Sequence, residues 1–97
     1  MYDYLKGQVT RITPEYIALE VQGIGYQLYT PNPFVFRINN QCQQIYVHMN
    51  VREDALDVFG FSTEYELDWF KMLITVNGVG PKAALAILSE LTVDEIA

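Results

Sequence analysis

The chain has 97 residues, which is enough for one ordinary domain or for two very small ones that share an interface. Hydrophobic residues make up 51% and aromatic residues 13% of the sequence, a composition that excludes general disorder. The formal net charge of −6 argues against nucleic-acid binding by bulk attraction, so any such binding must depend on local geometry. The single cysteine, Cys42, excludes an intrachain disulfide, and no stretch resembles a membrane span or a secretion signal. These features predict a cytoplasmic protein with no membrane partner.

Alternation of apolar and polar residues predicts five β-strands in the first part of the chain. The clearest example is the run in which Ile17, Leu19 and Val21 alternate with other residues, as in a half-buried strand. The expected strands lie around residues 4–12, 16–21, 24–28, 44–51 and 56–61. Turn-forming pairs such as Thr13-Pro14 and Gln22-Gly23 separate the first of them.

Five short strands with internal glycines suit a small closed barrel. The OB-fold is the common five-stranded barrel, and an SH3-like barrel fits the same pattern nearly as well. The periodicity alone does not choose between these two folds.

From residue 62 the periodicity becomes helical. Thr63 and Glu66 form the Thr-x-x-Glu pattern of a capping box, which predicts the start of a helix. We expect this helix to end at Asn77-Gly78, because both residues tolerate the left-handed conformation that ends helices. Pro81 suits the first position of a second helix, since its φ is fixed and it has no N–H to leave unpaired. A further capping box at residues 92–95 predicts the start of a third helix, so we expect the chain to be a fragment of a longer protein.

The segment between the two helices, residues 77–82, predicts a phosphate-binding hairpin. Gly78 and Gly80 allow a tight turn and leave no side chain in the way of a close approach. The second helix then presents unpaired N–H groups, and Lys82 adds a full positive charge. Such a site binds the nucleic-acid backbone and is indifferent to base sequence. The alternative is a plain helix-turn-helix corner with glycines that serve packing only; the spacings of a P-loop and of a dinucleotide fingerprint are absent.

An acidic turn, Glu53-Asp54, follows Arg52 between the fourth and fifth strands. Most acidic pairs of this kind belong to solvated loops. A metal site that includes Asp57 is weakly supported, since no histidine accompanies the carboxylates. No nucleophile or histidine partner accompanies them either, so we predict no catalytic residue, no metal and no cofactor.

Three aromatic side chains are assigned to structural positions. By alternation His48 falls on the outer side of its strand, and we expect it to be an ordinary surface histidine. Trp69 and Phe70 fit a core between the barrel and the first helix better than they fit a platform for stacked bases.

Several stretches, taken together in their order and spacing, resemble the RuvA family of Holliday-junction-binding proteins. They are Tyr4-Leu5-Lys6-Gly7, Val21-Gln22-Gly23-Ile24-Gly25-Tyr26, Val51-Arg52-Glu53-Asp54-Ala55, Phe59-Gly60-Phe61 and Asn77-Gly78-Val79-Gly80-Pro81-Lys82. The resemblance implies an α+β chain, with a five-stranded OB-fold β-barrel over residues 1–62 and a first helix-hairpin-helix over residues 63–97.

The resemblance also implies a function and a set of site residues. Relatives bind four-way junction DNA as a homotetramer, in recombination and repair, and hold it open for branch migration. The implied residues are the acidic pin Glu53 and Asp54, the phosphate-binding Gly78, Val79, Gly80 and Lys82, and the DNA-contacting Arg52. The implied partners are the motor ATPase RuvB, recruited through a C-terminal domain expected after Ala97, and the junction-resolving nuclease RuvC. The chain itself is expected to hydrolyse nothing.

Three other functions remain open from the residues alone. A tyrosine-rich barrel could stack single-stranded bases, which would make the chain a single-strand-binding module. A DNA glycosylase can also contain such a hairpin, but the Lys or Asp that follows it in those enzymes is missing here. A protein-interaction barrel would be insensitive to DNA and to salt.

Overall fold

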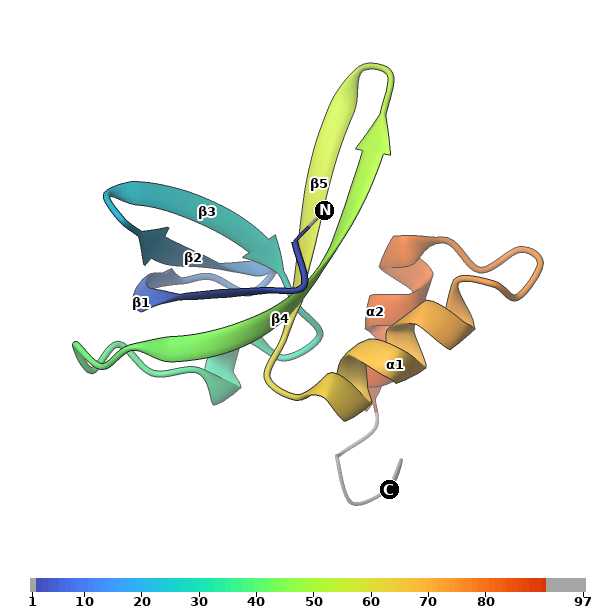
Figure 1. Ribbon diagram of the computed structural model, residues 1–97. Coiled ribbons are helices and arrows are strands. Elements are labelled where there is room, and N and C mark those ends of the chain that lie inside the picture. Colours follow the sequence, from blue (N-terminus) through green and yellow to red (C-terminus); the bar gives the residue numbers. More distant parts are fainter. Residues whose placement is uncertain (1, 91–97) are drawn as a thin grey trace.

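The structure, a computed structural model, describes residues 2–90 of the chain (Figure 1). In chain order its elements are β1 (Tyr4–Ile12), β2 (Tyr16–Val21), β3 (Ile24–Tyr29), the 3-10 helix η1 (Pro33–Val35), β4 (Gln43–Arg52), β5 (Ala55–Phe61), α1 (Glu64–Leu73) and α2 (Pro81–Glu90). The five expected strands and the starts of the first two expected helices are therefore confirmed. The expected third helix falls outside the described residues.

The strands form a closed barrel in the order β1-β2-β3-β5-β4, and β4 pairs back onto β1. Each pairing is antiparallel except that between β3 and β5, which is parallel and joins Tyr29 to Phe59. The exchanged order of β4 and β5, with the parallel contact, is the topology of an OB-fold and not of an SH3-like barrel. The expected fold class, an α+β chain with an OB barrel followed by a helical hairpin, is confirmed.

The alternation of the strands places one apolar set of side chains inside the barrel. Seven buried residues form this first core: Val9, Ile17, Leu19, Leu28, Phe36, Ile45 and Val47. Gly7 allows a close approach of β1 to β2, because a Cβ at this position would collide with the carbonyl oxygen of Glu20. The apolar residues of the alternating pattern in the strands are thus the ones that face the inside of the barrel.

A second core joins the helices to the barrel. Its buried members are Phe59, Phe61, Leu67, Phe70, Ala84 and Leu88. Phe70 of α1 is fully buried, and its ring centroid lies 5.2 Å from that of Phe59 and 4.9 Å from that of Phe61. Trp69 is half-buried against the same cluster, so the expected core role of both residues is confirmed. Because α1 and α2 share this core with β5, the start of α2 is held at a fixed position beside the strands.

The two helices begin where the sequence predicts, but α1 ends earlier. The hydroxyl of Thr63 accepts a hydrogen bond of 3.1 Å from the N–H of Glu66, as the capping box requires. The prediction that this helix runs to Asn77-Gly78 is wrong, since α1 ends at Leu73. Beyond Leu73 the chain forms a tighter turn, in which the N–H groups of Thr75 and Val76 donate to carbonyls three residues back, each at 3.1 Å. The hydroxyl of Thr75 also donates to the carbonyl of Met72, at 2.6 Å. Within the described part of the chain, neither helix has the length and apolar character needed to cross a membrane.

His48 lies on the outer side of β4, but α1 covers this side. The ring centroid of His48 lies 5.6 Å from that of Phe70, and the side chain is half-buried. The prediction of an ordinary surface histidine is therefore wrong, because alternation does not tell whether a helix covers the outer side of a strand. Burial, and to a smaller extent the positive charge of Lys71, lower the pKa of His48 from its usual value of 6.5.

This lowered pKa predicts that the free energy of unfolding decreases as the pH falls from about 7 to about 5. Protons bind first to the unfolded chain, where His48 keeps its higher pKa, and they draw the equilibrium toward that state. Urea denaturation at both pH values should show a smaller loss of stability in His48→Gln than in the wild type. Burial raises the pKa of Glu66, which acts in the opposite direction, but this residue is present in both proteins. An equal loss in the two proteins would contradict the assignment to His48.

Candidate nucleic-acid interface

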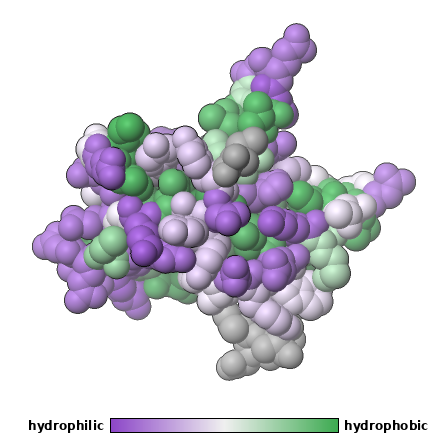
Figure 2. All heavy atoms as spheres, in the orientation of Figure 1, coloured by the Kyte–Doolittle hydropathy of each residue, from purple (hydrophilic) through white to green (hydrophobic). Residues whose placement is uncertain are grey.

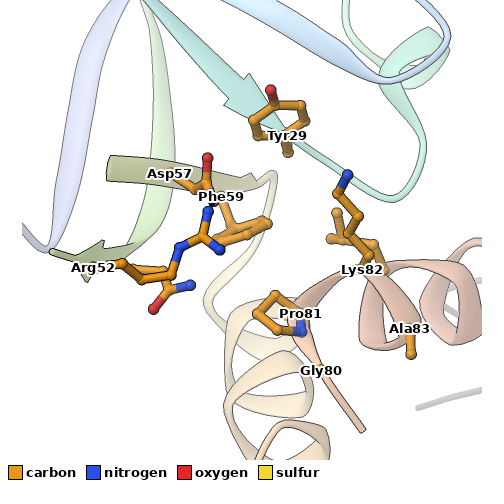
Figure 3. A pocket seen from close by; sticks show the side chains of 10 residues that line it. Tyr29, Arg52, Asp57, Phe59, Gly80, Pro81, Lys82 and Ala83 are labelled. Carbon is orange, nitrogen blue, oxygen red and sulfur yellow. Dashed lines mark hydrogen bonds and ion pairs between the residues drawn. The ribbon is translucent and has the colours of Figure 1, made fainter. Parts of the chain in front are cut away.

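A cleft of about 370 Å³ lies between the β4–β5 hairpin, the end of β3 and the start of α2 (Figure 3). Its lining residues are Tyr29, Asn50, Arg52, Asp57, Phe59, Gly80, Pro81, Lys82, Ala83 and Leu85. Arg52 extends from the strand hairpin toward Asp57, and Lys82 extends from α2 on the other side. The fold therefore brings the predicted contact residue Arg52 to the same cleft as Gly80 and Lys82 of the glycine hairpin.

The start of α2 presents two free backbone donors at this cleft. The first helical residue, Pro81, has no N–H, and the N–H of Ala84 donates to the carbonyl of Gly80 at 3.0 Å. The N–H groups of Lys82 and Ala83 have no acceptor among residues 2–90. These donors, together with the positive end of the helix dipole and the exposed Lys82 side chain, suit an anion such as a phosphate.

The loop before α2 is fixed in a tight turn by Gly78 and Val79. Gly78 has φ +89°, a conformation that residues with a side chain rarely adopt. The N–H of Val79 donates to the carbonyl of Val76 at 3.0 Å, and its side chain packs against the second core. Of the four predicted phosphate-binding residues, Gly80 and Lys82 line the cleft, whereas Gly78 and Val79 shape and anchor the loop that precedes it.

The acidic pair Glu53-Asp54 is the two-residue turn at the end of the β4–β5 hairpin, between the paired residues Arg52 and Ala55. We call this pair the acidic tip. Both side chains are exposed, and neither has an ion-pair partner in the described part of the chain. The nearest cation along the chain, Arg52, pairs instead with Asp57, at 3.0 Å. The two carboxylates of the acidic tip are therefore exposed to solvent, with no cation paired to them among residues 2–90.

The hairpin projects well beyond the body of the barrel, on the side where α2 begins (Figure 1). Its end is hydrophilic, with a hydrophobic band directly behind it (Figure 2). Val51 and Leu56, which pair across the two strands, are 60% and 56% exposed. The start of α2 thus lines the cleft, and the acidic tip ends the hairpin whose strands form the opposite wall of this cleft.

Two polar residues of the cleft were not singled out as DNA contacts from the sequence. Asn50 and Asp57 are paired across β4 and β5, on the same side of the hairpin as Arg52. A two-residue turn at Glu53-Asp54 places Arg52 opposite Ala55 and Asn50 opposite Asp57. Because side chains alternate along a strand, this pairing predicts that Asn50, Arg52 and Asp57 lie on the same side of the hairpin. Among residues 2–90, no three or more His, Cys, Asp or Glu side chains lie together in an arrangement that could hold a metal ion.

In comparison with known proteins, two separate segments of the chain match two family models. Residues 1–60 match the family model described as the RuvA N terminal domain. Residues 70–97 match the model of the SAM-like helix-hairpin-helix tandem.

Curated relatives agree with the first of these models. The proteins named "Holliday junction branch migration complex subunit RuvA" include one from Lysinibacillus sphaericus, 62% identical over 92% of this chain and 43% of the relative. The protein of the same name from Listeria monocytogenes serotype 4a is 52% identical over 92% of this chain and 45% of its own length. The protein of the same name from Bacillus velezensis is 46% identical over 91% of this chain and 43% of its own length. The chain spans less than half the length of these relatives. Because the N-terminal model alone covers more than half of its residues, the chain belongs to the RuvA family.

Proposed function

We propose that this chain binds four-way junction DNA and, as a homotetramer, holds the junction open for branch migration. The observation that carries the proposal is the cleft between the start of α2, which has two free N–H donors, and the strand hairpin, which ends in the acidic tip. The printed name of the relatives, a subunit of the Holliday junction branch migration complex, supports the same function.

Attraction in this proposal comes from the start of α2. The free N–H groups of Lys82 and Ala83 and the ammonium group of Lys82 bind a backbone phosphate of one duplex arm. Gly78 and Val79 hold the loop in the shape that exposes these donors, and Arg52 adds a second positive charge from the opposite wall. Because these groups contact the backbone and not the bases, binding does not depend on DNA sequence. The few cations aimed at the cleft explain how a chain with a net charge of −6 can bind a polyanion.

Repulsion comes from the acidic tip. When the chains assemble around a fourfold axis, the carboxylates of Glu53 and Asp54 converge on the crossover and keep the phosphates of the four arms apart. A continuous duplex placed across the centre would meet the same carboxylates, whereas a junction leaves the centre open. The acidic tip therefore favours the junction by lowering the affinity for continuous duplex DNA.

The proposal includes assembly and partners. Four copies would bring four acidic tips to the centre, and the exposed apolar pair Val51 and Leu56 lies directly behind each tip, where neighbouring copies would meet. The energy for migration is supplied by the motor ATPase RuvB, and RuvC is the nuclease that resolves the junction; this chain catalyses no step itself.

A gel-shift titration tests the proposal. It compares a four-way junction, a linear duplex of equal length and single-stranded oligo-dT, with the 97-residue chain and with a protein spanning the full length of its relatives. We expect the full-length protein to prefer the junction at moderate salt. Tighter binding to oligo-dT than to the junction would instead support the single-strand-binding alternative. Of the barrel tyrosines, Tyr16, Tyr26 and Tyr29 are half-buried, whereas Tyr4 of β1 is 47% exposed, so the oligo-dT comparison is needed to decide against this alternative.

A further inference from the structure

Asp57 places a negative charge in the cleft that is proposed to bind phosphate. By charge alone this carboxylate should weaken DNA binding. It lies diagonally across the hairpin from Arg52, and its Oδ2 is 3.0 Å from an Nη of the guanidinium group. The side chain of Arg52 is 56% exposed and that of Asp57 31% exposed, so the pair lies at the mouth of the cleft and not in the core. The free energy of such an exposed pair contributes little to folding, so stability does not explain its position.

The geometry of the pair leaves most of the guanidinium group free. A guanidinium group has five N–H donors in a fixed plane, and Asp57 takes one contact at a single nitrogen. A free arginine side chain loses rotamer freedom when it binds a phosphate, and an arginine already held in place loses less. An acidic partner can therefore strengthen phosphate binding by an arginine, provided that it holds the arginine in the correct direction.

We propose that Asp57 is a positioning residue. It holds the Arg52 guanidinium over the cleft, so that a phosphate bound by Lys82 and the start of α2 is also contacted from the opposite wall. Each subunit then clamps one DNA strand between its strand hairpin and its helix hairpin. This inference rests on the proposed function, because it assumes that the cleft binds DNA.

A double-mutant cycle tests this inference in the full-length protein. The four proteins are the wild type, Asp57→Asn, Arg52→Gln and the double variant, each titrated with duplex and junction DNA over a range of salt concentrations. We expect Asp57→Asn to weaken binding about threefold when Arg52 is present, and not to weaken it in the Arg52→Gln background. The slope of log K against log salt should become less steep by about 0.9 per lost contact in Arg52→Gln, and by a smaller amount in Asp57→Asn.

Other outcomes overturn the inference. If Asp57→Asn tightens binding equally with and without Arg52, the carboxylate only repels DNA. If Asp57→Asn weakens binding equally in both backgrounds, or leaves binding unchanged in both, Asp57 does not act through Arg52. Thermal unfolding of each variant checks that the fold is kept. Lys82→Ala in the same assay separates this inference from the proposed function: unchanged binding in Lys82→Ala contradicts the phosphate site itself, whereas weakened binding without coupling between Asp57 and Arg52 contradicts only the positioning role.

Discussion

Replacing Glu53 by Gln and Asp54 by Asn should raise the affinity for linear duplex DNA by on the order of tenfold to a hundredfold and change junction affinity much less. A unit charge about 7 Å from a phosphate costs ~0.6 kcal/mol in water. Convergence of the carboxylates of four tips at one crossover adds several such penalties, and about 1.4 kcal/mol corresponds to a factor of ten in affinity. The duplex meets these charges at the centre, whereas the junction leaves it open. Competition gel shifts with junction and duplex in the same tube measure the ratio directly.

A matched control separates the position of these charges from their number. Glu20→Gln with Asp68→Asn also removes two carboxylates, so both double variants change the formal net charge from −6 to −4. Glu20 and Asp68 are exposed and do not line the cleft. We expect this control to tighten binding to junction and duplex slightly and to the same extent. A junction-to-duplex ratio that changes equally in both double variants would show that total charge, and not the acidic tip, sets the preference.

The barrel could be predicted from the sequence because each of its strands has one side in the core. In β2, for example, Ile17 and Leu19 are fully buried and alternate with residues that are not. The end of α1 could not be predicted in the same way, since Asn77-Gly78 is a strong local signal and the earlier change to hydrogen bonds that span three residues has no comparable signal in the sequence. The partial burial of His48 cannot be predicted from alternation, because the side chain that covers it is Phe70, more than twenty positions away in the sequence.

The candidate site was predictable in its parts but not as a whole. The glycine hairpin and the acidic turn are both recognisable as local motifs. That the glycine hairpin and the strand hairpin face each other across one cleft depends on the second core, which fixes α2 against β5 through Phe59 and Phe70. The contact between Arg52 and Asp57 depends in turn on a two-residue turn at the tip, which sets the strand register. Local patterns identify which groups carry the chemistry, and packing between distant segments decides which of them meet.

Replacing Lys82 by Ala should weaken binding to both duplex and junction DNA, and by a larger factor at low salt than at high salt. A lysine that neutralises one phosphate contributes about 0.9 to the slope of log K against log salt, so four copies contribute roughly 3.6 when all four arms are bound. Between 50 and 200 mM salt, this difference in slope changes the ratio of wild-type to variant affinity by a factor on the order of a hundred. The preference for the junction should remain, because the acidic tip is intact. Fluorescence anisotropy at several salt concentrations measures both the slope and the loss of affinity.

Lys71→Ala is the matched control for this variant. Lys71 is an exposed lysine of the neighbouring helix α1 and does not line the cleft. Its replacement by Ala changes the net charge by the same amount as Lys82→Ala. We expect Lys71→Ala to lower the affinity only slightly and to leave the slope almost unchanged. Equal slopes for Lys82→Ala and the wild type would mean that Lys82 contacts no phosphate. Attraction at the cleft would then have to come from the free N–H groups of α2 and from Arg52.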